Sequence, residues 1–579
     1  MAWSGEKSSR NNGLGLGDTC CSCGYSRLRQ HKSMKPVVSG PASMLAREQN
    51  LVDLLIKNGI VVDGSGGPAF SADIVVDGGR ICEVGDCKIK QATKIIDAHG
   101  LAVCPGFIDM HTHSDISLLA NPRQESKVMQ GVTTEVLGQD GLSYAPVDAV
   151  TLSTLRKSLT ALNGDAEGVS WDWTSVGDFL SRFDGNVAVN VCYLVPHAAI
   201  RLMVLGEEDR LATDGELARM QAAVVEAMRE GAVGFSTGLT YAPCAFSDTR
   251  ELVACCRGIE PFGGYFAPHL RSYGGHFTSA IEEALQVARE SSVSLHLTHF
   301  HCSFEVNKDR VEEILAHLDQ AAATGIKVTL DSYPYTAGST FLGGFFPSWV
   351  HGGGPNKFLA RISSLNDRKR IQREMEEEGC DGYSHVPVEW EKIAVAGVGS
   401  LKNQWMAGKS VAELARLTGK SAFDFACGLL IDENLQVSCL AFFGYDKNVQ
   451  AIMKHPAHMV GTDGLLVGSR PHPRAYGTFA RYLQHYTREL KLLTLEACIQ
   501  KMTSLPAAVL GLHDRGFVRK GQIADLVVFN PESVEDTATY ENPRNHPRGI
   551  QFVLVNGKVV VEYGKHTGVL AGQVLRRHA

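Results

Sequence analysis

Short apolar runs alternate with amphipathic stretches through most of the middle of the chain. Val132–Leu137, Val187–Val195 and Val293–Thr298 are examples of the apolar runs. Between such runs, Asp214–Glu230 and Thr278–Glu290 carry apolar residues at the three- and four-residue spacing of one helix face. Continuous apolar runs are typical of strands that are buried on both faces, as parallel strands are. The pattern therefore predicts an α/β domain.

We expect eight such strands between residues of about 106 and 510. They are Gly106–Asp109, Val132–Leu137, Val187–Val195, Gly231–Ser236, Gly264–Pro268, Val293–Thr298, Lys327–Asp331 and Met459–Thr462. Eight strands that alternate with helices predict a TIM-type (β/α)8 barrel. The largest insertion, about residues 341–435, follows the seventh strand. Because long insertions in compact domains are often functional, we expect it to shape a substrate site.

The two ends of the chain have a different pattern, with short strands separated by Gly and Asp. Leu54–Val62 and Ala72–Val76 are examples near the start, and Phe552–Val555 precedes the hairpin signal Asn556-Gly557 near the end. We expect residues 51–105 and 511–579 to form one small β-rich domain around the barrel of residues 106–510. Residues 1–50 lack sustained periodicity, which predicts a disordered tail.

Composition narrows the class of protein. The chain has 579 residues, a formal net charge of −7, 44% hydrophobic and 21% charged residues, which is ordinary for a globular protein. No basic excess points to a nucleic-acid partner, and no apolar run reaches the roughly 18 residues of a membrane span. The first 50 residues lack the apolar core of a secretory signal, although their arginines leave an organelle-targeting interpretation open.

The cysteines indicate a reducing compartment. There are 15, an odd number, and most are scattered singly through hydrophobic segments, unlike a disulfide framework. Cys20, Cys21 and Cys23 lack a second ligand pair at zinc-finger spacing, so we assign them no role. We therefore expect a cytoplasmic protein, and from the composition neither a nucleic-acid nor a membrane partner.

The clearest chemical signal is a His-x-His pair at the end of an apolar strand. His111 and His113 directly follow Gly106–Asp109. Residues two apart on a strand face the same side, so both imidazoles can reach one metal ion. A lone His-x-His pair is a weak signal, but its position after an apolar strand and before Ser114-Asp115 makes it a strong one.

Residues with metal-ligand chemistry also follow four later strands. The carboxyl ends of barrel strands meet at one mouth, so these residues are expected to converge there. Mixed imidazole and carboxylate ligands suit zinc or a comparable transition metal. We predict one or two zinc ions, with ligands drawn from His111, His113, Asp140, His269, His299 and Asp463.

Further motifs extend this signal along the chain. They are Pro105–His113, Gln130–Thr134, Gly234–Tyr241, Asp331–Thr340, Gly461–Gly464, Pro471–Arg474 and Gly521–Phe529. Over roughly residues 51–575 the sequence resembles the N-acyl-D-amino-acid deacylase (D-aminoacylase) branch of the amidohydrolase superfamily. The first and last motifs are shared across the superfamily, whereas Tyr333–Thr340 and Pro471–Arg474 are specific to this branch.

The resemblance implies hydrolysis of the amide bond of N-acyl-D-amino acids by metal-activated water, which gives a carboxylate and a free D-amino acid. It implies that Asp463 both binds metal and acts as general acid/base, and that Tyr241 lies near the scissile carbonyl. It implies that Arg474 binds the substrate carboxylate, in one pocket with Tyr333 and Ser339. The four histidines predicted as ligands match metal ligands of the family.

Two positions depart from the family pattern. Asp140 stands where many members have a cysteine ligand, and a harder oxygen ligand would change the metal preference and affinity. His301 stands where the family often has a lysine that helps to hold the acid group of the substrate. This places His301 among the expected substrate contacts and weakens one contact with the carboxylate.

Other functions remain open from the sequence. A cyclic amidase of the superfamily usually carries a lysine on strand four, and Gly231–Ser236 contains none. A D-dipeptidase is a further alternative. A catalytically inactive barrel retained as an oligomeric scaffold would have lost ligands, whereas this chain keeps nearly all of them. The residues do not indicate the acyl or side-chain preference, and the oligomeric state stays unknown.

Overall fold

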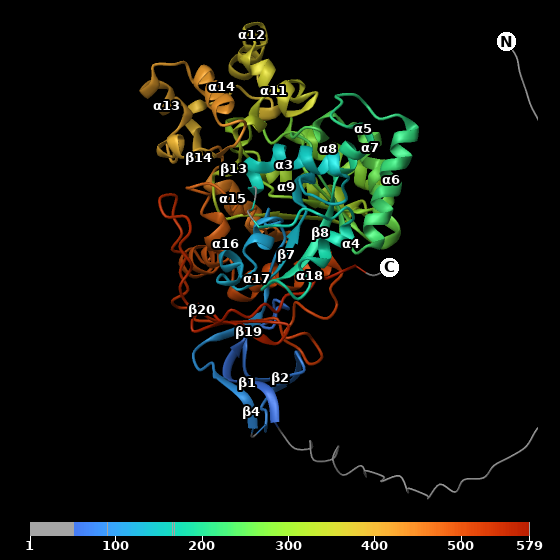
Figure 1. Cartoon of the computed structure of the whole chain (residues 1–579). Coiled ribbons are helices and arrows are strands. Elements are labelled where there is room, and N and C mark those ends of the chain that lie inside the picture. Colours follow the sequence, from blue (N-terminus) through green and yellow to red (C-terminus); the bar gives the residue numbers. More distant parts are fainter. Residues whose placement is uncertain (1–50, 90, 165, 167, 578–579) are drawn as a thin grey trace, which may run out of the picture. The chain divides into compact units, whose positions relative to one another are not determined.

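The computed structural model describes residues 51–89, 91–164, 166 and 168–577. The tail expected over residues 1–50 lies outside the described residues. The described part contains an eight-stranded parallel sheet, a nine-stranded sheet and a three-stranded sheet. Figure 1 labels strands of all three sheets.

The eight parallel strands form a barrel. They are β6 (Phe107–Asp109), β7 (Val132–Leu137), β8 (Asn190–Pro196), β9 (Gly234–Gly238), β10 (Tyr265–His269), β11 (Ser294–Leu297), β12 (Val328–Ser332) and β16 (His458–Val460), hydrogen-bonded in that order. The first and last strands meet because Met110 N donates to Val460 O at 3.2 Å and Asp463 N donates to His111 O at 2.7 Å. The predicted TIM-type barrel is confirmed.

The barrel interior is packed with side chains. Met110, Val136, Leu194, Tyr265 and Met459 belong to one buried cluster that these strands share. Successive residues of a strand point to opposite faces, so the intervening residues pack outward against helices. The interior is therefore a core, and the chemistry of a TIM barrel belongs to the loops at the carboxyl ends of its strands.

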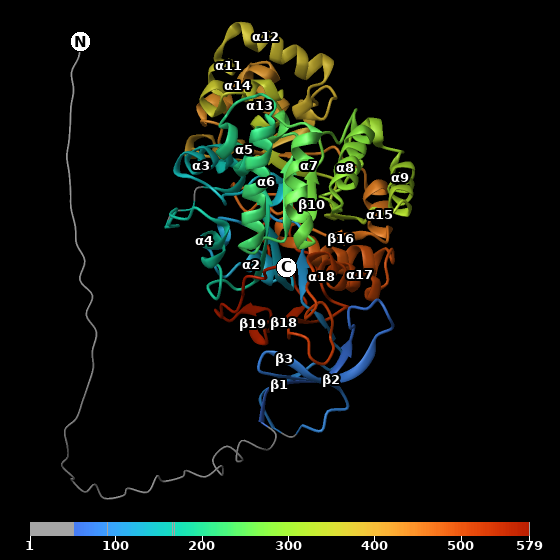
Figure 2. The same cartoon turned by 90° about the vertical axis from the view of Figure 1, so that its right-hand side faces the viewer.

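Helices surround the barrel, and Figure 2 shows α6, α7 and α8 beside one another on one flank. The long α6 begins with a capping box between Thr213 and Glu216 and buries Met220, Val224 and Met228 at helical spacing. The helices outside the insertion are α1 (Ser117–Ala120), α2 (Glu125–Val128), α3 (Ala149–Asn163), α4 (Val176–Ser181), α5 (His197–Leu205), α6 (Asp214–Arg229), α7 (Thr249–Ile259), α8 (Phe277–Ser291), α9 (Val311–Ala323), α15 (Asp446–Lys454), α16 (Arg474–Arg481), α17 (Leu495–Met502) and α18 (Ser504–Leu510).

The nine-stranded sheet combines both ends of the described chain. Its strands are β1 (Leu51–Val61), β2 (Phe70–Asp77), β3 (Arg80–Gly85), β4 (Gln91–Asp97), β5 (Ala102–Pro105), β17 (Leu526–Phe529), β18 (Ile550–Val555), β19 (Lys558–Glu562) and β20 (Lys565–His566). The two halves join where β17 pairs antiparallel with β5. Asn556 and Gly557 both have positive φ, as the predicted two-residue hairpin turn requires. The predicted β-rich domain from both chain ends is confirmed.

The chain between β12 and α15 leaves the barrel and forms a subdomain of its own. Its elements are β13 (Gly338–Phe341), α10 (Ser348–His351), α11 (Gly354–Ser363), α12 (Leu365–Arg373), β14 (Ile393–Val398), α13 (Val411–Thr418), α14 (Ala422–Asp432) and β15 (Val437–Ala441). The central strand β15 pairs antiparallel with both β13 and β14. The insertion lies at the end of the barrel opposite the nine-stranded sheet (Figure 1).

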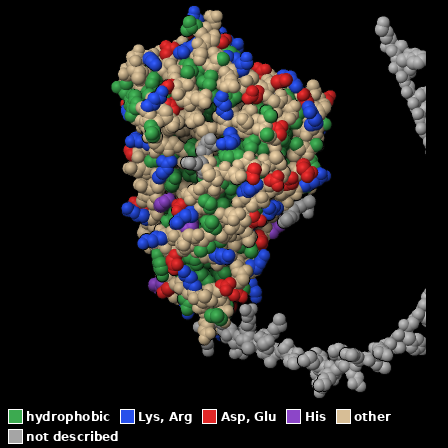
Figure 3. Space-filling view, in the orientation of Figure 1, with side chains coloured by type: hydrophobic (Ala, Val, Ile, Leu, Met, Phe, Trp, Pro, Cys, Tyr) green, Lys and Arg blue, Asp and Glu red, His purple; other side chains and the backbone are tan. Residues whose placement is uncertain are grey.

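The surface carries charges of both signs. On the face seen in Figure 3, Lys and Arg side chains are interspersed with Asp and Glu. That face therefore offers no continuous basic stretch of the kind that binds nucleic acid. None of the helices in the described residues is long and apolar enough to cross a membrane.

Candidate metal centre and substrate pocket

Six predicted ligands come together at the carboxyl ends of five barrel strands. His111 and His113 follow β6, Asp140 follows β7, and His269 ends β10. His299 follows β11 and Asp463 follows β16. All six side chains are buried. We call these six residues the open cluster.

The ligand atoms of the open cluster fall into two groups that share Asp140. In the first group, Nε2 of His113 lies 3.5 Å from Asp140 Oδ2 and 3.4 Å from Asp463 Oδ1. Nε2 of His111 lies 3.7 Å from Asp140 Oδ1 and from Asp463 Oδ1. Two ligands on one tetrahedral zinc ion, each bonded at about 2.0–2.1 Å, lie roughly 3.3–3.4 Å apart. The observed separations are therefore close to those of one coordination shell.

The second group joins Asp140 to the other two histidines. Oδ2 of Asp140 lies 3.6 Å from His269 Nδ1 and 3.3 Å from His299 Nε2. The two histidine nitrogens are 2.9 Å apart. Asp140 thus stands between the groups, where its carboxylate can serve two ions.

Several atoms of the open cluster lack partners. Within the described part of the chain, both ring nitrogens of His111, Nδ1 of His113 and Oδ1 of Asp140 are buried without a hydrogen bond. Unpaired buried polar groups are costly. A bound cation would compensate the carboxylates and the unpaired ring nitrogens of the open cluster. The residues present therefore fit a metal ion.

The loops that carry the cluster have unusual backbone conformations. Asp140, His299 and Asp463 all have positive φ, at 55°, 31° and 47°. Such conformations are uncommon for residues other than glycine, and they concentrate at functional sites. Gly138 (φ 76°) supports the first loop, because a Cβ atom there would lie 2.2 Å from the carbonyl oxygen of Leu194.

The charges of the open cluster act on one another. Burial alone would lower the pKa of His113, but the carboxylates of Asp140 and Asp463 raise it to about 9. Burial would raise the pKa of Asp463, yet Arg474 and then the neighbouring histidines hold it below its usual range. The carboxylate of Asp463 is therefore ionised and able to accept a proton.

Three further residues, to which the sequence assigned no role, contact the predicted ligands. Thr240 Oγ1 lies 2.8 Å from His269 Nε2, and Tyr273 Oη lies 3.1 Å from His299 Nδ1. Asp331 Oδ1 accepts from the backbone N of His299 at 2.9 Å. Contacts of this kind fix the orientation of metal ligands. Asp331 and Thr240 lie within the quoted motifs, whereas no sequence signal marks Tyr273.

A second set of buried polar residues lies next to the open cluster. Lys127 Nζ contacts Asp109 Oδ2 at 2.6 Å, Thr112 Oγ1 at 2.6 Å and Thr462 Oγ1 at 2.7 Å. Oδ1 of Asp109 also accepts from the backbone N of Thr462 at 2.8 Å. We call these four residues the closed cluster. It ties the loop after β6 to the loop after β16, which together carry three predicted ligands.

Arg474 lies beside the open cluster and is fully buried. Its Nη2 is 2.9 Å from Asp463 Oδ2 and donates to the backbone oxygen of Ser339 at 3.2 Å. Nε and Nη1 have no hydrogen-bond partner among the described residues. A guanidinium with two unpaired donors is suited to bind a carboxylate.

The other predicted substrate contacts surround Arg474. The ring of Tyr333 lies 4.3 Å from the Arg474 guanidinium and 4.3 Å from the His301 ring. Burial, followed by the charges of His299 and Arg474, lowers the pKa of His301 to about 3, so this imidazole is neutral. The hydroxyl of Ser339 donates to the backbone oxygen of Cys439 at 3.1 Å.

Tyr241 lies beside His269 and Thr340. Its hydroxyl is 2.9 Å from Thr340 Oγ1, and its ring centre is 4.8 Å from that of His269. Burial raises the pKa of Tyr241 above its usual value, so the hydroxyl keeps its proton.

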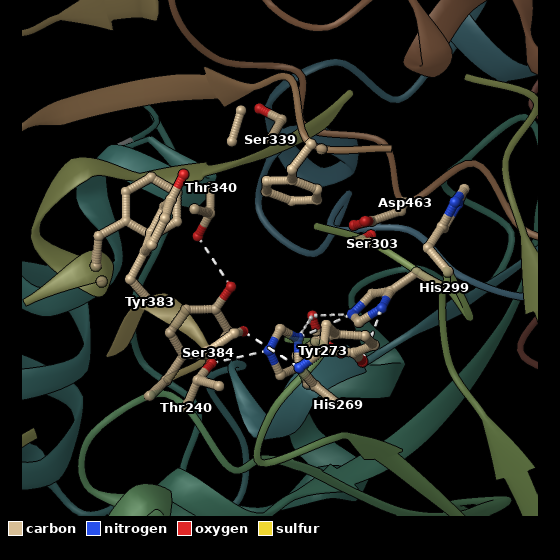
Figure 4. Close-up of a pocket in the computed structure, with 18 of the residues that line it drawn as sticks. Thr240, His269, Tyr273, His299, Ser303, Ser339, Thr340, Tyr383, Ser384 and Asp463 are labelled. Atoms are coloured by element: carbon tan, nitrogen blue, oxygen red, sulfur yellow. Dashed lines mark hydrogen bonds and ion pairs between the residues drawn. The ribbon is translucent and has the colours of Figure 1, made fainter. Parts of the chain in front are cut away.

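One cavity connects these predicted residues. It encloses about 800 Å³, part of it open to solvent, and it is lined by His113, Asp140, Tyr241, His269, His299, His301, Tyr333, Ser339 and Asp463, among others. Figure 4 shows His269, His299 and Asp463 on one side of it and Thr340 and Tyr383 across from them. Of the predicted site residues, His111 and Arg474 are not among the lining residues of this cavity, but each contacts Asp463, which is.

Comparisons with known proteins agree with this arrangement. A model of the amidohydrolase family matches residues 94–561. D-aminoacylase of Alcaligenes xylosoxydans xylosoxydans is 36% identical over 528 residues, which cover 91% of this chain and 98% of the relative. A D-aminoacylase structure with a binuclear metal centre has a TM-score of 0.77 at 35% identity, covering 91% of this chain and all of that chain.

A solved structure of a different deacylase is also similar. It is N-acyl-D-glutamate deacylase of Bordetella bronchiseptica, in complex with zinc and a phosphonate inhibitor that mimics the tetrahedral intermediate of the reaction. Its TM-score is 0.76 at 32% identity, and the match covers 91% of this chain and 99% of that chain.

Proposed function

The chain belongs to the D-aminoacylase branch of the amidohydrolase family, and from this premise we propose that it hydrolyses the amide bond of N-acyl-D-amino acids. The observation that carries the proposal is that an incompletely satisfied ligand cluster and a buried arginine with unpaired donors meet at Asp463. The reaction adds water across the amide bond and releases a carboxylate and a free D-amino acid. The D configuration is inferred from the relatives.

The open cluster would hold one or two zinc ions. His111, His113 and Asp463 would serve one position, His269 and His299 the other, and Asp140 both. Bound zinc would lower the pKa of a water molecule and polarise the scissile carbonyl. Nitrogen and oxygen ligands in this mixture suit zinc.

Asp463 would move the proton. Its Oδ1 faces His111 and His113, while its Oδ2 is held by Arg474. Its carboxylate accepts a proton from the attacking water as oxygen adds to the carbonyl carbon. It then returns that proton to the nitrogen as the C–N bond breaks, which is general base and then general acid catalysis.

Arg474 would bind the α-carboxylate of the substrate. Its free Nε and Nη1 supply donors, and Tyr333 restricts the guanidinium from one face. Tyr241 would donate to the carbonyl oxygen, because its protonated hydroxyl lies on the opposite wall beside Thr340. These two contacts orient the amide bond across the open cluster.

The experiment compares an N-acetyl-D-amino acid with its carboxamide, which lacks the carboxylate. Zinc-loaded protein is expected to release acetate from the acid with a much larger kcat/KM, because only the acid pairs with Arg474. Equal kcat/KM values for the two substrates would contradict the assignment of Arg474. No acetate release from either substrate would contradict the proposed function.

A further inference from the structure

A second cavity adjoins the candidate active site. Its empty space amounts to about 880 Å³, with the part that is open solvent included. Its lining is mainly apolar and includes Leu155, Leu159, Leu202, Phe246, Phe341 and Phe358. These residues come from α3, α5, the loop after β9, β13 and α11. We call this cavity the side chamber.

The side chamber and the active-site cavity share one wall. Leu142, Thr240, Tyr241 and Gly344 line both. The rings of Tyr241 and Phe341 are 5.3 Å apart. A Cβ atom on Gly344 would lie 3.2 Å from the Tyr241 ring and 3.3 Å from the Phe341 ring. The two cavities therefore adjoin at these four residues, and Gly344 places no side chain between them.

The position of Tyr241 indicates which part of a substrate would enter the chamber. In the proposed function, Tyr241 contacts the carbonyl oxygen, so the group attached to the carbonyl carbon begins beside the shared wall. The amino-acid side chain begins two atoms farther away, next to the carboxylate that Arg474 binds. Apolar residues of the active-site cavity lie there, since Ala441 and Phe443 line it together with Ser339.

We propose that the side chamber binds the acyl chain of the substrate, and that the enzyme prefers N-acyl-D-amino acids with acyl groups longer than acetyl. This inference rests on the proposed function. Transfer of an alkyl chain from water into an apolar site increases its affinity for that site by about fourfold for each buried methylene. The apolar lining supplies that burial directly beside the scissile bond.

Two polar residues in the chamber are compatible with an alkyl chain. His351 Nε2 is 3.1 Å from the backbone oxygen of Gly343. Burial, its largest influence, lowers the pKa of His351 to about 4, so it is neutral. Glu207 is partly exposed and lies next to Gly354, at the border of the chamber, where its carboxylate keeps contact with water.

The test measures kcat/KM for N-acetyl, N-butanoyl and N-octanoyl derivatives of one D-amino acid with zinc-loaded wild-type protein. The octanoyl substrate is expected to exceed the acetyl substrate by at least about tenfold. An octanoyl value below the acetyl value would overturn the inference and leave the proposed function intact.

The Gly343→Leu variant fills the chamber. Gly343 lines the side chamber and not the active-site cavity, and a Cβ atom there meets nothing closer than 3.6 Å. The octanoyl-to-acetyl ratio is expected to fall by about tenfold or more. The matched control is Gly215→Leu in α6, where a Cβ atom meets nothing within 4 Å and the ratio is expected to stay at the wild-type value.

A second variant and a binding measurement also test whether the side chamber binds the acyl chain. If Gly343→Leu does not fold, Ser158→Phe fills the chamber from the half-buried face of α3 and must lower the same ratio. If the wild-type protein hydrolyses none of the substrates, the proposed function fails. Calorimetry then tests separately whether the side chamber binds the acyl chain. Tighter binding of the octanoyl than of the acetyl compound, weakened by Gly343→Leu, supports this inference, and equal binding of the two compounds overturns it.

Discussion

The open cluster and the closed cluster lie next to each other at the same end of the barrel, and both bury charge. In the closed cluster, Lys127 Nζ has three partners within 2.7 Å, and each carboxylate oxygen of Asp109 accepts a hydrogen bond. In the open cluster, both ring nitrogens of His111 and Nδ1 of His113 have no hydrogen-bond partner in the described part of the chain. Since buried charge must be compensated, the difference separates a cluster that the protein satisfies by itself from one that a ligand completes.

The two clusters are also joined through the backbone. Thr112 of the closed cluster lies between His111 and His113, and Thr462 directly precedes Asp463. The closed cluster therefore holds in place the segments that carry half of the predicted ligands. Substitutions in either cluster test this difference in roles.

The largest effect is expected from Asp463→Asn. The amide cannot accept the proton of the attacking water, so kcat is expected to fall by about a thousandfold, with the fold preserved. Initial-rate kinetics measure the loss, and circular dichroism and metal analysis check the fold and the zinc content. Near wild-type kcat in a variant that still holds zinc would contradict the role of Asp463.

Lys127→Met tests the closed cluster. It leaves the buried carboxylate of Asp109 without its cation, which is expected to cost roughly 3–5 kcal/mol of folding free energy. Urea unfolding measures this loss.

Lys402→Met is the matched control, because Lys402 Nζ also lies 2.6 Å from a carboxylate, that of Asp432, but the pair is exposed. Exposed ion pairs contribute little, so its unfolding midpoint is expected to stay near that of the wild type. Equal unfolding midpoints for Lys127→Met and Lys402→Met would contradict the assigned role of the closed cluster.

Arg474→Lys tests the proposed contact between Arg474 and the substrate carboxylate. Lysine keeps the charge beside Asp463 but lacks the planar pair of donors, so KM for N-acyl-D-amino acids is expected to rise by roughly tenfold to a hundredfold. Steady-state kinetics with the matching carboxamide provide the control. A similar rise in KM for the carboxamide would show that the effect does not come from the carboxylate.

The smallest effect is expected from Thr240→Val, which removes the hydroxyl beside His269 Nε2. Loss of an orienting contact typically weakens metal binding by about tenfold or more. Competition with a chelator measures the zinc affinity. Unchanged affinity would mean that Thr240 does not orient His269.

The sequence predicted the barrel well because each strand is encoded locally. Val132–Leu137 was expected as a strand and is one, with its bounds unchanged. The three-stranded sheet of the insertion was not expected, because β13 and β15 pair across about a hundred residues of sequence. Periodicity identifies single elements and says little about such distant pairing.

The candidate site was predictable in part for the same reason. Ligands that directly follow strands, such as His113 and His269, could be identified from position alone. Tyr273 contacts His299 from an irregular loop, and this contact depends on loop geometry that no pattern in the sequence encodes. Arg474 was expected from the motif Pro471–Arg474, but its pairing with Asp463 depends on the loop that precedes α16.

The proposed function is tested most directly by amine release from paired N-acetyl-D- and N-acetyl-L-amino acids, with zinc-loaded protein and with the same protein after chelation. We expect release from the D-series, little from the L-series, and loss of activity on chelation that zinc restores. Preference for the L-series, or equal activity after complete removal of metal, would contradict the proposed function.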